Sequence, residues 1–125
     1  MSENARKRAQ HVISENTRTV AAAEALARND MAEVGCLMAE AHWSYSRDFE
    51  ASCPEADAMV ELAQDIPGLI GARLTGGGFG GCTVNLVKMA NVQEFARILA
   101  GRYEAKIGIK PQIHICHASG GAHRL

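Results

Sequence analysis

The stretch from residue 69 to residue 88 reads LIGARLTGGGFGGCTVNLVK and decides the fold class. On both sides of its central glycines, apolar residues alternate with polar or small residues. A period of two residues is typical of strands that bury one face. The stretch therefore predicts two strands, at about 69–75 and 82–88, which we expect to pair antiparallel around the glycine segment 76–81.

Apolar residues at three- and four-residue steps predict four helices around these strands. Three helices precede them, at about 4–28, 31–51 and 54–66, and a fourth follows at about 91–106. In the first helix, the apolar residues that recur at these steps are Val12, Ile13, Val20, Ala23 and Ala27.

Turn and capping residues set the predicted boundaries. Asn29-Asp30 supplies a turn and an N-cap between the first two helices, which should form an antiparallel pair. Ser52-Cys53-Pro54-Glu55 predicts a helix start with Ser52 as the capping residue. A last strand is expected at about 111–118, with Ile113 and Ile115 buried.

The order of elements is therefore three helices, two strands, one helix and one strand. We expect residues 1–125 to form a single domain, because no repeat, low-complexity tract or internal linker interrupts the pattern. Helices that pack on a small sheet in this order define an α+β fold class.

Composition excludes several classes of function. The chain has 13 basic and 14 acidic residues and a formal net charge of -1, so neither a nucleic acid nor a membrane surface is an expected partner. The four cysteines are irregularly spaced, which favours reduced thiols in a cytoplasmic protein. No metal ligands are predicted, and no apolar run approaches the ~18 residues of a spanning helix.

The glycine segment has two readings. Five of its six residues are glycine, and a hairpin could use one or two of them for positive φ. A loop this rich in glycine also lets bare backbone N–H groups approach a ligand such as a phosphate. Gly76, Gly78 and Gly81 match G-x-G-x-x-G, but that fingerprint needs a helix after the loop, where a strand is predicted. A P-loop is excluded because no Lys-Ser or Lys-Thr follows.

Together with its flanks, this segment resembles the third motif of the GHMP sugar kinases, a superfamily that includes galactokinase, homoserine kinase, mevalonate kinase and phosphomevalonate kinase. The residues that carry this resemblance are Gly71-Ala72-Arg73-Leu74 and the following residues 75–82. Within them, Phe79-Gly80-Gly81-Cys82 is similar to the galactokinases in particular. Gly77 departs from the pattern, since galactokinases commonly have alanine there. The segments that extend the resemblance over nearly the whole chain are Arg8-Ala9-Gln10-His11-Val12, Glu15-Asn16, Arg18, Asp48-Phe49-Glu50, Ser52-Cys53-Pro54-Glu55, Asp57 and Gly120-Gly121-Ala122.

The resemblance implies the C-terminal domain of such a kinase, with a ferredoxin-like antiparallel sheet whose first strand belongs to an upstream part. The complete enzyme would use ATP and Mg²⁺ to phosphorylate galactose or a related sugar at its anomeric hydroxyl. The residues expected to shape the substrate and phosphate region are Thr75, Gly76, Gly77, Gly78, Phe79, Gly80 and Gly81.

The family's sugar motif, phosphate loop and catalytic aspartate are not matched in these 125 residues. We therefore expect no catalytic residue here, no tightly bound cofactor and no activity from the chain alone. Its expected partners are the missing N-terminal kinase domain and a second copy of the chain, because the absent strand would leave sheet edges unpaired. A non-catalytic regulatory or binding module made from such a domain is the alternative.

Other polar residues have two readings each. His11, Glu15 and Arg18 share a predicted helix face. This face would contact the missing domain or the substrate, or it would be a solvated or inter-helix polar face; we favour the latter. Arg73 would approach a phosphate or remain an exposed strand residue. The aromatic group of His42, Trp43 and Tyr45 would form a sugar-stacking platform or, as we prefer, pack between helices. Asp48 and Glu50 are predicted on different sides of a helix, so they should not form a carboxylate pair.

Overall fold

The computed structural model describes residues 2–75 and 82–117. The elements within these ranges are α1 (Glu3–Ala27), α2 (Met31–Arg47), α3 (Pro54–Ala63), β1 (Leu69–Thr75), β2 (Cys82–Val87), the 3-10 helix η1 (Met89–Asn91) and α4 (Val92–Ile107). Four α-helices and a two-stranded antiparallel sheet confirm the predicted α+β class.

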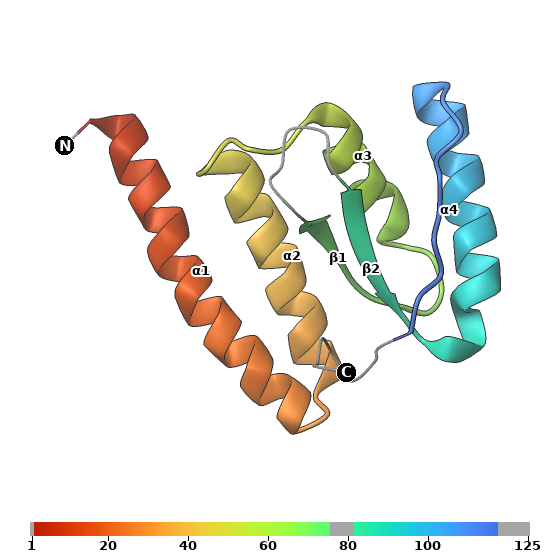
Figure 1. Ribbon diagram of the computed structural model, residues 1–125, viewed down its shortest axis with the longest axis horizontal. Coiled ribbons are helices and arrows are strands. Elements are labelled where there is room, and N and C mark those ends of the chain that lie inside the picture. Colours follow the sequence, from red (N-terminus) through yellow and green to blue (C-terminus); the bar gives the residue numbers. More distant parts are fainter. Residues whose placement is uncertain (1, 76–81, 118–125) are drawn as a thin grey trace, which may run out of the picture.

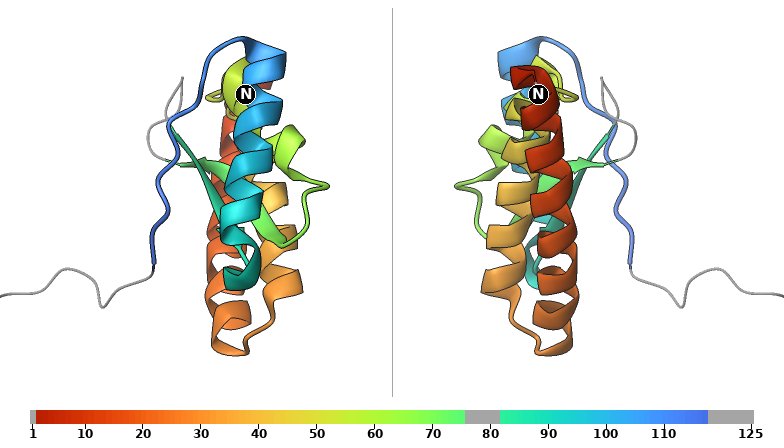
Figure 2. Two further views of the ribbon diagram at one scale, coloured as in Figure 1. Left: turned by 90° about the vertical axis from the view of Figure 1, so that its right-hand side faces the viewer. Right: turned by 90° about the vertical axis from the view of Figure 1, so that its left-hand side faces the viewer.

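The elements lie side by side in a layer, with α3 behind the sheet (Figure 1). α1 packs along α2, α2 packs along β1, and α4 contacts α3 on the far side of β2. The narrow side views show how thin this arrangement is (Figure 2). No helix among the described residues is long and apolar enough to cross a membrane.

The turn between α1 and α2 is the one that the sequence predicts. Asn29 takes a positive φ of 58°, a conformation that asparagine tolerates better than most residues. Asp30 then caps α2, since its Oδ1 accepts a hydrogen bond of 3.2 Å from the Glu33 N–H. The two helices run antiparallel as expected (Figure 1).

The connection between α2 and α3 differs from the prediction. α2 ends at Arg47, and Glu50 has a positive φ of 57°, so Asp48 and Glu50 lie after the helix and not on its sides. Cys53, not Ser52, occupies the N-cap position of α3 and makes no side-chain cap bond. The Ser52 hydroxyl donates instead to Asp57 Oδ1 at 2.8 Å, a stronger partner because it is charged.

The sheet has one face against the core. β1 and β2 pair antiparallel, with Leu74 opposite Thr83 and Thr75 opposite Cys82. Ala72 is buried in a cluster with residues of α3, of α4 and of the connection from α3 to β1: Val60, Ala63, Ile66, Phe95 and Leu99. On the opposite face, Val84 and Leu86 are exposed.

Glycines allow α2 to lie directly against β1. A Cβ added to Gly35 of α2 would stand 1.9 Å from the carbonyl oxygen of Ile70. A Cβ on Gly71 of β1 would stand 2.7 Å from the sulfur of Met38. These close approaches hold β1 in place beside α2.

The predicted strand at 111–118 is wrong for residues 111–117, which form neither strand nor helix; residue 118 lies outside the described residues. The chain is drawn out after α4 and stands off from the sheet (Figure 2). Ile113 and Ile115 are exposed. Alternation indicates an extended chain, but a strand also needs a neighbouring edge with which to exchange hydrogen bonds.

The apolar residues whose spacing predicted α1 do not face the core. His11 and Ala25 are its buried residues, whereas Val12, Ile13 and Val20 are exposed. The helix turns a partly polar side toward α2 and leaves apolar side chains without cover among the described residues.

Candidate functional site

The ends of the two strands frame the glycine segment. Thr75 and Cys82 pair in register and are both exposed. Of the seven predicted loop residues, only Thr75 is described; residues 76–81 lie outside the described ranges. The described strands on both sides agree with the predicted antiparallel pair, and Cys82 starts a strand, which excludes the dinucleotide fingerprint.

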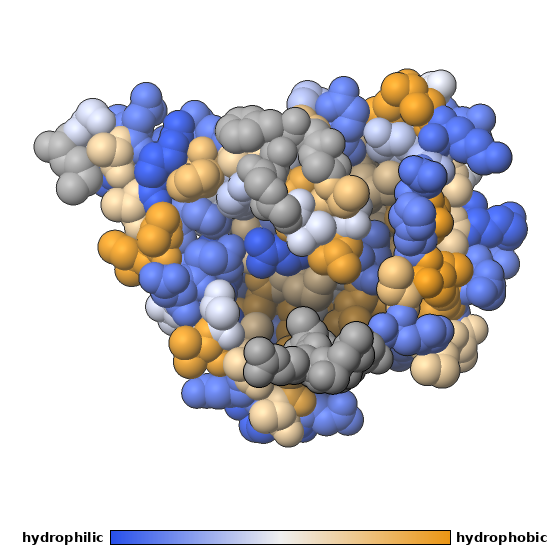
Figure 3. All heavy atoms as spheres, viewed as in Figure 1, coloured by the Kyte–Doolittle hydropathy of each residue, from blue (hydrophilic) through white to orange (hydrophobic). Residues whose placement is uncertain are grey.

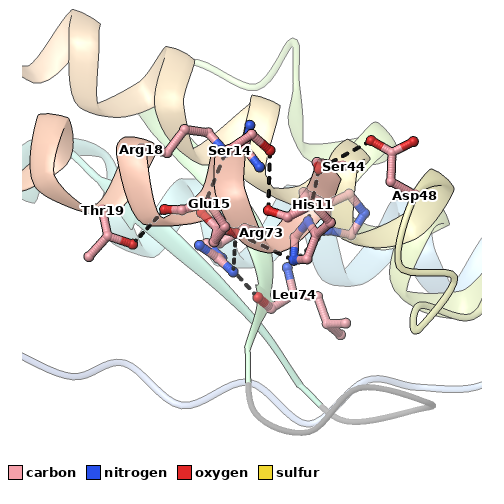
Figure 4. A network of polar contacts seen from close by, with 10 residues as sticks. His11, Ser14, Glu15, Arg18, Thr19, Ser44, Asp48, Arg73 and Leu74 are labelled. Atoms are coloured by element: carbon pink, nitrogen blue, oxygen red, sulfur yellow. Dashed lines mark hydrogen bonds and ion pairs between the residues drawn. The ribbon is translucent and has the colours of Figure 1, made fainter. Parts of the chain in front are cut away.

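A polar cluster behind the first strand joins α1, α2 and β1 (Figure 4). We call His11, Glu15, Arg18, Ser44 and Arg73 the Glu15 cluster. Glu15 lies between two guanidinium groups: Arg18 Nε is 3.4 Å from its Oε1, and Arg73 Nη2 is 3.7 Å from its Oε2. Glu15 Oε2 and Arg18 Nη2 are buried without a hydrogen bond. Ion pairing alone therefore offsets the cost of removing these two atoms from water.

His11 completes the cluster at the α1–α2 contact. Its Nδ1 is 2.8 Å from the Ser44 hydroxyl, and its ring packs against Tyr45 and Phe49 at centroid distances of 5.4 and 5.2 Å. Burial lowers the pKa of His11, and the nearby Glu15 carboxylate opposes that effect. Of the two forms of the favoured reading, this face is therefore an inter-helix polar face and not a solvated one.

Arg73 is a half-buried strand residue whose side chain makes contacts within the chain. Its Nε donates to the Leu74 carbonyl oxygen at 3.0 Å, and its Nη2 faces Glu15. Figure 4 shows Arg73 between α1 and the end of β1. The arginine thus bonds the carbonyl of Leu74, the residue before the end of β1.

A second cluster, which we call the His42 cluster, consists of His42, Ser46, Ser52 and Asp57. His42 is fully buried. Its Nδ1 accepts the Leu74 N–H at 3.0 Å, and its Nε2 is 2.9 Å from Asp57 Oδ1. Asp57 also accepts the hydroxyl protons of Ser46 at 2.9 Å and Ser52 at 2.8 Å.

The partners of His42 define its protonation. Because Leu74 offers a backbone N–H, the Nδ1 that accepts it carries no proton. The proton then lies on Nε2 and points at Asp57, so the ring is neutral. Burial, the largest influence, lowers the pKa of His42, while the hydrogen bond to Asp57 acts in the opposite direction.

The aromatic residues near His42 serve packing. Trp43 meets the His42 ring edge-on at a centroid distance of 4.7 Å and packs against the core, with the Arg47 guanidinium 5.2 Å from its ring. Tyr45 stacks on Phe49 at 5.5 Å. The preferred packing reading is confirmed for Trp43 and Tyr45. His42 is buried in the core as well, but it also bonds Leu74 and Asp57, which that reading did not include. The sequence analysis did not predict that Asp57 accepts hydrogen bonds from His42, Ser46 and Ser52. The available signal was a histidine and an aspartate on two consecutive helices.

The described residues hold no group of three or more His, Cys, Asp or Glu side chains suited to a metal ion. The four cysteines are free. Two open depressions of about 420 and 500 Å³ follow α1, and residues of this one helix line them. Neither depression adjoins Thr75, so the site rests on the strand ends and the two clusters behind them.

Comparison with known proteins places the chain in a family. A family model described as GHMP kinases C terminal matches residues 22–105. The chain belongs to this family. The resemblance noted from the glycine segment and its flanks is thereby confirmed, as is the assignment to a GHMP kinase C-terminal fold.

The relatives with the same architecture are galactokinases. Galactokinase from Actinobacillus pleuropneumoniae serotype 5b (strain L20) is 52% identical over 125 residues, which cover 99% of this chain and 33% of the relative. Galactokinase from Bacillus subtilis (strain 168) is 40% identical over 124 residues, with 99% and 32% covered. The chain spans about a third of the length of these relatives.

A solved structure agrees with the sequence relatives. The crystal structure of Lactococcus lactis galactokinase complexed with galactose matches with a TM-score of 0.83 and 38% sequence identity. The match covers 87% of this chain and 28% of the galactokinase chain. The similarity therefore extends from sequence to backbone arrangement.

Proposed function

We propose that this chain is the C-terminal part of a galactokinase-like enzyme, which transfers the γ-phosphoryl group of ATP to the anomeric hydroxyl of galactose. The observation that carries the proposal is the 52% identity to a galactokinase over 99% of the chain. The galactokinase structure with a TM-score of 0.83 supports the same assignment. The complete enzyme would use Mg²⁺ with ATP, and its sugar would be galactose or a related sugar.

Within that enzyme, the segment from Thr75 to Gly81 would shape the region of the sugar and the transferred phosphate. Phosphoryl transfer depends mainly on positioning and on stabilisation of charge. Backbone N–H groups in a glycine-rich segment suit this task because no side chain keeps a phosphate away. The chain alone would bind no cofactor tightly and would have no activity, since the rest of the site would come from the upstream part.

The upstream kinase domain is the proposed partner, and apolar surface supports this. Val12, Ile13 and Val20 project from α1, and Val84 and Leu86 from the open face of the sheet. Figure 3 shows apolar residues over both regions. We propose that this domain covers these residues and adds a strand between β2 and the drawn-out segment 111–117.

When that domain is absent, a second copy of the chain would take its place. Exposed apolar side chains beside an unpaired strand edge favour association. Sedimentation velocity at increasing concentration should therefore show a dimer or higher oligomer. A monomer at high concentration would contradict this part of the proposal.

The free cysteines support a reducing compartment, and we propose a cytoplasmic location.

A chimera tests the function. In it, this chain replaces the corresponding third of the A. pleuropneumoniae galactokinase, to which it is 52% identical. We expect galactose-dependent ADP production from the chimera and none from the isolated chain. Gly78→Val should lower kcat/KM of the chimera by about tenfold or more, because a side chain would hold the phosphate away from the backbone.

Gly101→Ala is the matched control, since a Cβ at Gly101 meets no atom within 4 Å. It should leave kcat/KM unchanged. A folded chimera without activity would contradict the proposal and favour a non-catalytic binding or regulatory module. Galactose-dependent activity of the isolated chain would show that the upstream part is not needed.

A further inference from the structure

Leu74 is the second-last described residue before the glycine segment. Its backbone is bonded at the edge of β1 that faces away from β2. In an antiparallel pair, successive residues direct their backbone groups alternately toward the partner strand and away from it. The Leu74 N–H points away, because it donates to His42 on α2. The next residue, Thr75, is the one that pairs with Cys82.

Both backbone groups of Leu74 on this edge are bonded to side chains. His42 Nδ1 accepts its N–H at 3.0 Å, and Arg73 Nε donates to its carbonyl oxygen at 3.0 Å. These are the two bonds that a neighbouring strand would otherwise supply. Figure 4 shows Leu74 next to Arg73 at this edge.

Each of the two side chains is itself held by a carboxylate on a different helix. Asp57 of α3 accepts a hydrogen bond of 2.9 Å from His42 Nε2–H, and its position is fixed by the Ser46 and Ser52 hydroxyls. Glu15 of α1 faces the Arg73 guanidinium at 3.7 Å. A ring whose second nitrogen is bound to a fixed acceptor keeps one tautomer and one orientation.

We infer that His42 is a positioning residue for the proposed phosphoryl transfer: as a neutral ring protonated on Nε2, it holds Leu74 and thereby sets the direction in which the chain leaves β1 into the glycine segment. Asp57 selects the tautomer, and Arg73 holds the other backbone group of the same residue. The catalytic part of this inference rests on the proposed function, whereas the hydrogen bonds on which it depends do not.

Full burial argues for this role over a general packing role. A histidine is a costly way to fill a core, because each ring nitrogen loses a water molecule and must find a partner. An aliphatic side chain would fill the same volume without that cost. Here both nitrogens are used, and one of them bonds the backbone of a residue 32 positions away, next to the end of β1.

Two variants separate the two bonds of the ring. His42→Asn places an amide oxygen near the position of Nδ1, so an acceptor for Leu74 remains and the donor to Asp57 is lost. His42→Gln places an amide N–H near the position of Nε2, so the donor to Asp57 remains and the acceptor is lost. Ser46→Ala is the control, because it removes a hydroxyl from Asp57 without touching Leu74.

Hydrogen exchange and nitrogen NMR on the chain provide the first test. In the unmodified chain, Nδ1 of His42 should show the shift of an unprotonated ring nitrogen at neutral pH. His42→Gln should speed exchange of the Leu74 amide about tenfold more than exchange of the Leu99 amide in the core, the factor that corresponds to one hydrogen bond. His42→Asn and Ser46→Ala should change the two amides by similar factors.

The same variants in the galactokinase chimera provide the second test. His42→Gln should lower kcat more than His42→Asn does, with a smaller difference in KM for ATP. A proton on Nδ1, or equal changes at Leu74 and Leu99 in both histidine variants, would overturn the inference. Equal losses of kcat in an active chimera would overturn it as well, whereas an inactive unmodified chimera would contradict the proposed function alone.

Discussion

The two faces of the β1–β2 sheet are built differently. On the face toward α3 and α4, Ala72 of β1 and Leu99 of α4 are 1% and 3% exposed and belong to one buried apolar cluster. On the other face, Val84 and Leu86 are 45% and 37% exposed. One face of the sheet is thus covered by the helices of this chain, whereas the other face exposes apolar residues that another protein segment can cover.

The largest expected effect lies on the closed face. Leu99→Ala removes buried methyl groups and should lower the free energy of unfolding by about 2–5 kcal/mol. Val84→Ala, on the open face, should change it by less than about 0.5 kcal/mol in the isolated chain. Urea denaturation measures both. Equal losses would mean that the open face is covered in solution.

The contact between α2 and β1 should be the next most sensitive. Gly35→Ala would bring a Cβ within 1.9 Å of the Ile70 carbonyl oxygen, and the required shift should cost about 1–3 kcal/mol. Gly101→Ala is the matched glycine in the middle of α4, and it should stabilise the chain by up to about 1 kcal/mol. A tolerated Gly35→Ala, measured by urea denaturation, would show that the helix and the strand can separate freely.

Acid should destabilise the chain through its two buried histidines. Burial lowers the pKa of both His11 and His42 in the folded state, while the unfolded chain has a histidine pKa of about 6.5. As the pH falls below about 6.5, the unfolded state binds protons that the folded state does not. The free energy of unfolding should therefore decrease, by at most about 1.4 kcal/mol per pH unit for each histidine.

Urea denaturation between about pH 6.5 and pH 5 measures this slope, and His42→Asn should reduce it. The carboxylates whose pKa is lowered by arginine partners, Glu3, Asp65 and Glu94, contribute at lower pH. A flat profile above pH 5 would contradict neutral, buried rings.

The smallest expected effect is on α1. Ile13 is 68% exposed, so Ile13→Ser should change the stability of the isolated chain by less than about 0.5 kcal/mol. In the chimera the same change should cost more, because the upstream domain would cover this side chain. Thermal unfolding of the two proteins compares the costs, and equal small effects would place α1 outside the interface.

Sequence patterns predicted the elements that are defined by local chemistry. Turn and cap residues located the α1–α2 boundary at Asn29 and Asp30, and the period of two located β1 and β2. The family resemblance came from a glycine segment whose residue types admit few other readings. Each of these signals spans only a few consecutive residues, so it can be recognised without knowledge of tertiary contacts.

The errors arose where a distant partner decides the outcome. Residues 111–117 have the alternation of a strand, but they pair with no strand among the described residues. The spacing of Val12 and Ile13 predicted a helix correctly but did not show which side of it faces the core. Conversely, His42 was assigned to packing, and its bonds to Leu74 and Asp57 were not foreseen because they join three separate elements. Spacing along the chain does not show which side chain completes a backbone edge.

Hydrogen exchange of these 125 residues, measured in the isolated chain and within the galactokinase chimera, tests most directly whether one face is complete and the other awaits a partner. The N–H groups of Thr83 and Asn85 point away from β1, because Leu74, which pairs with Thr83, points away from β2. We expect the amides of Thr83, Asn85, Ile113 and Ile115 to exchange at least about tenfold more slowly in the chimera, because they gain strand partners. The amides of Val60 and Leu99 should change by the same factor as global stability and no more. Identical exchange at all these positions in both proteins would contradict the account.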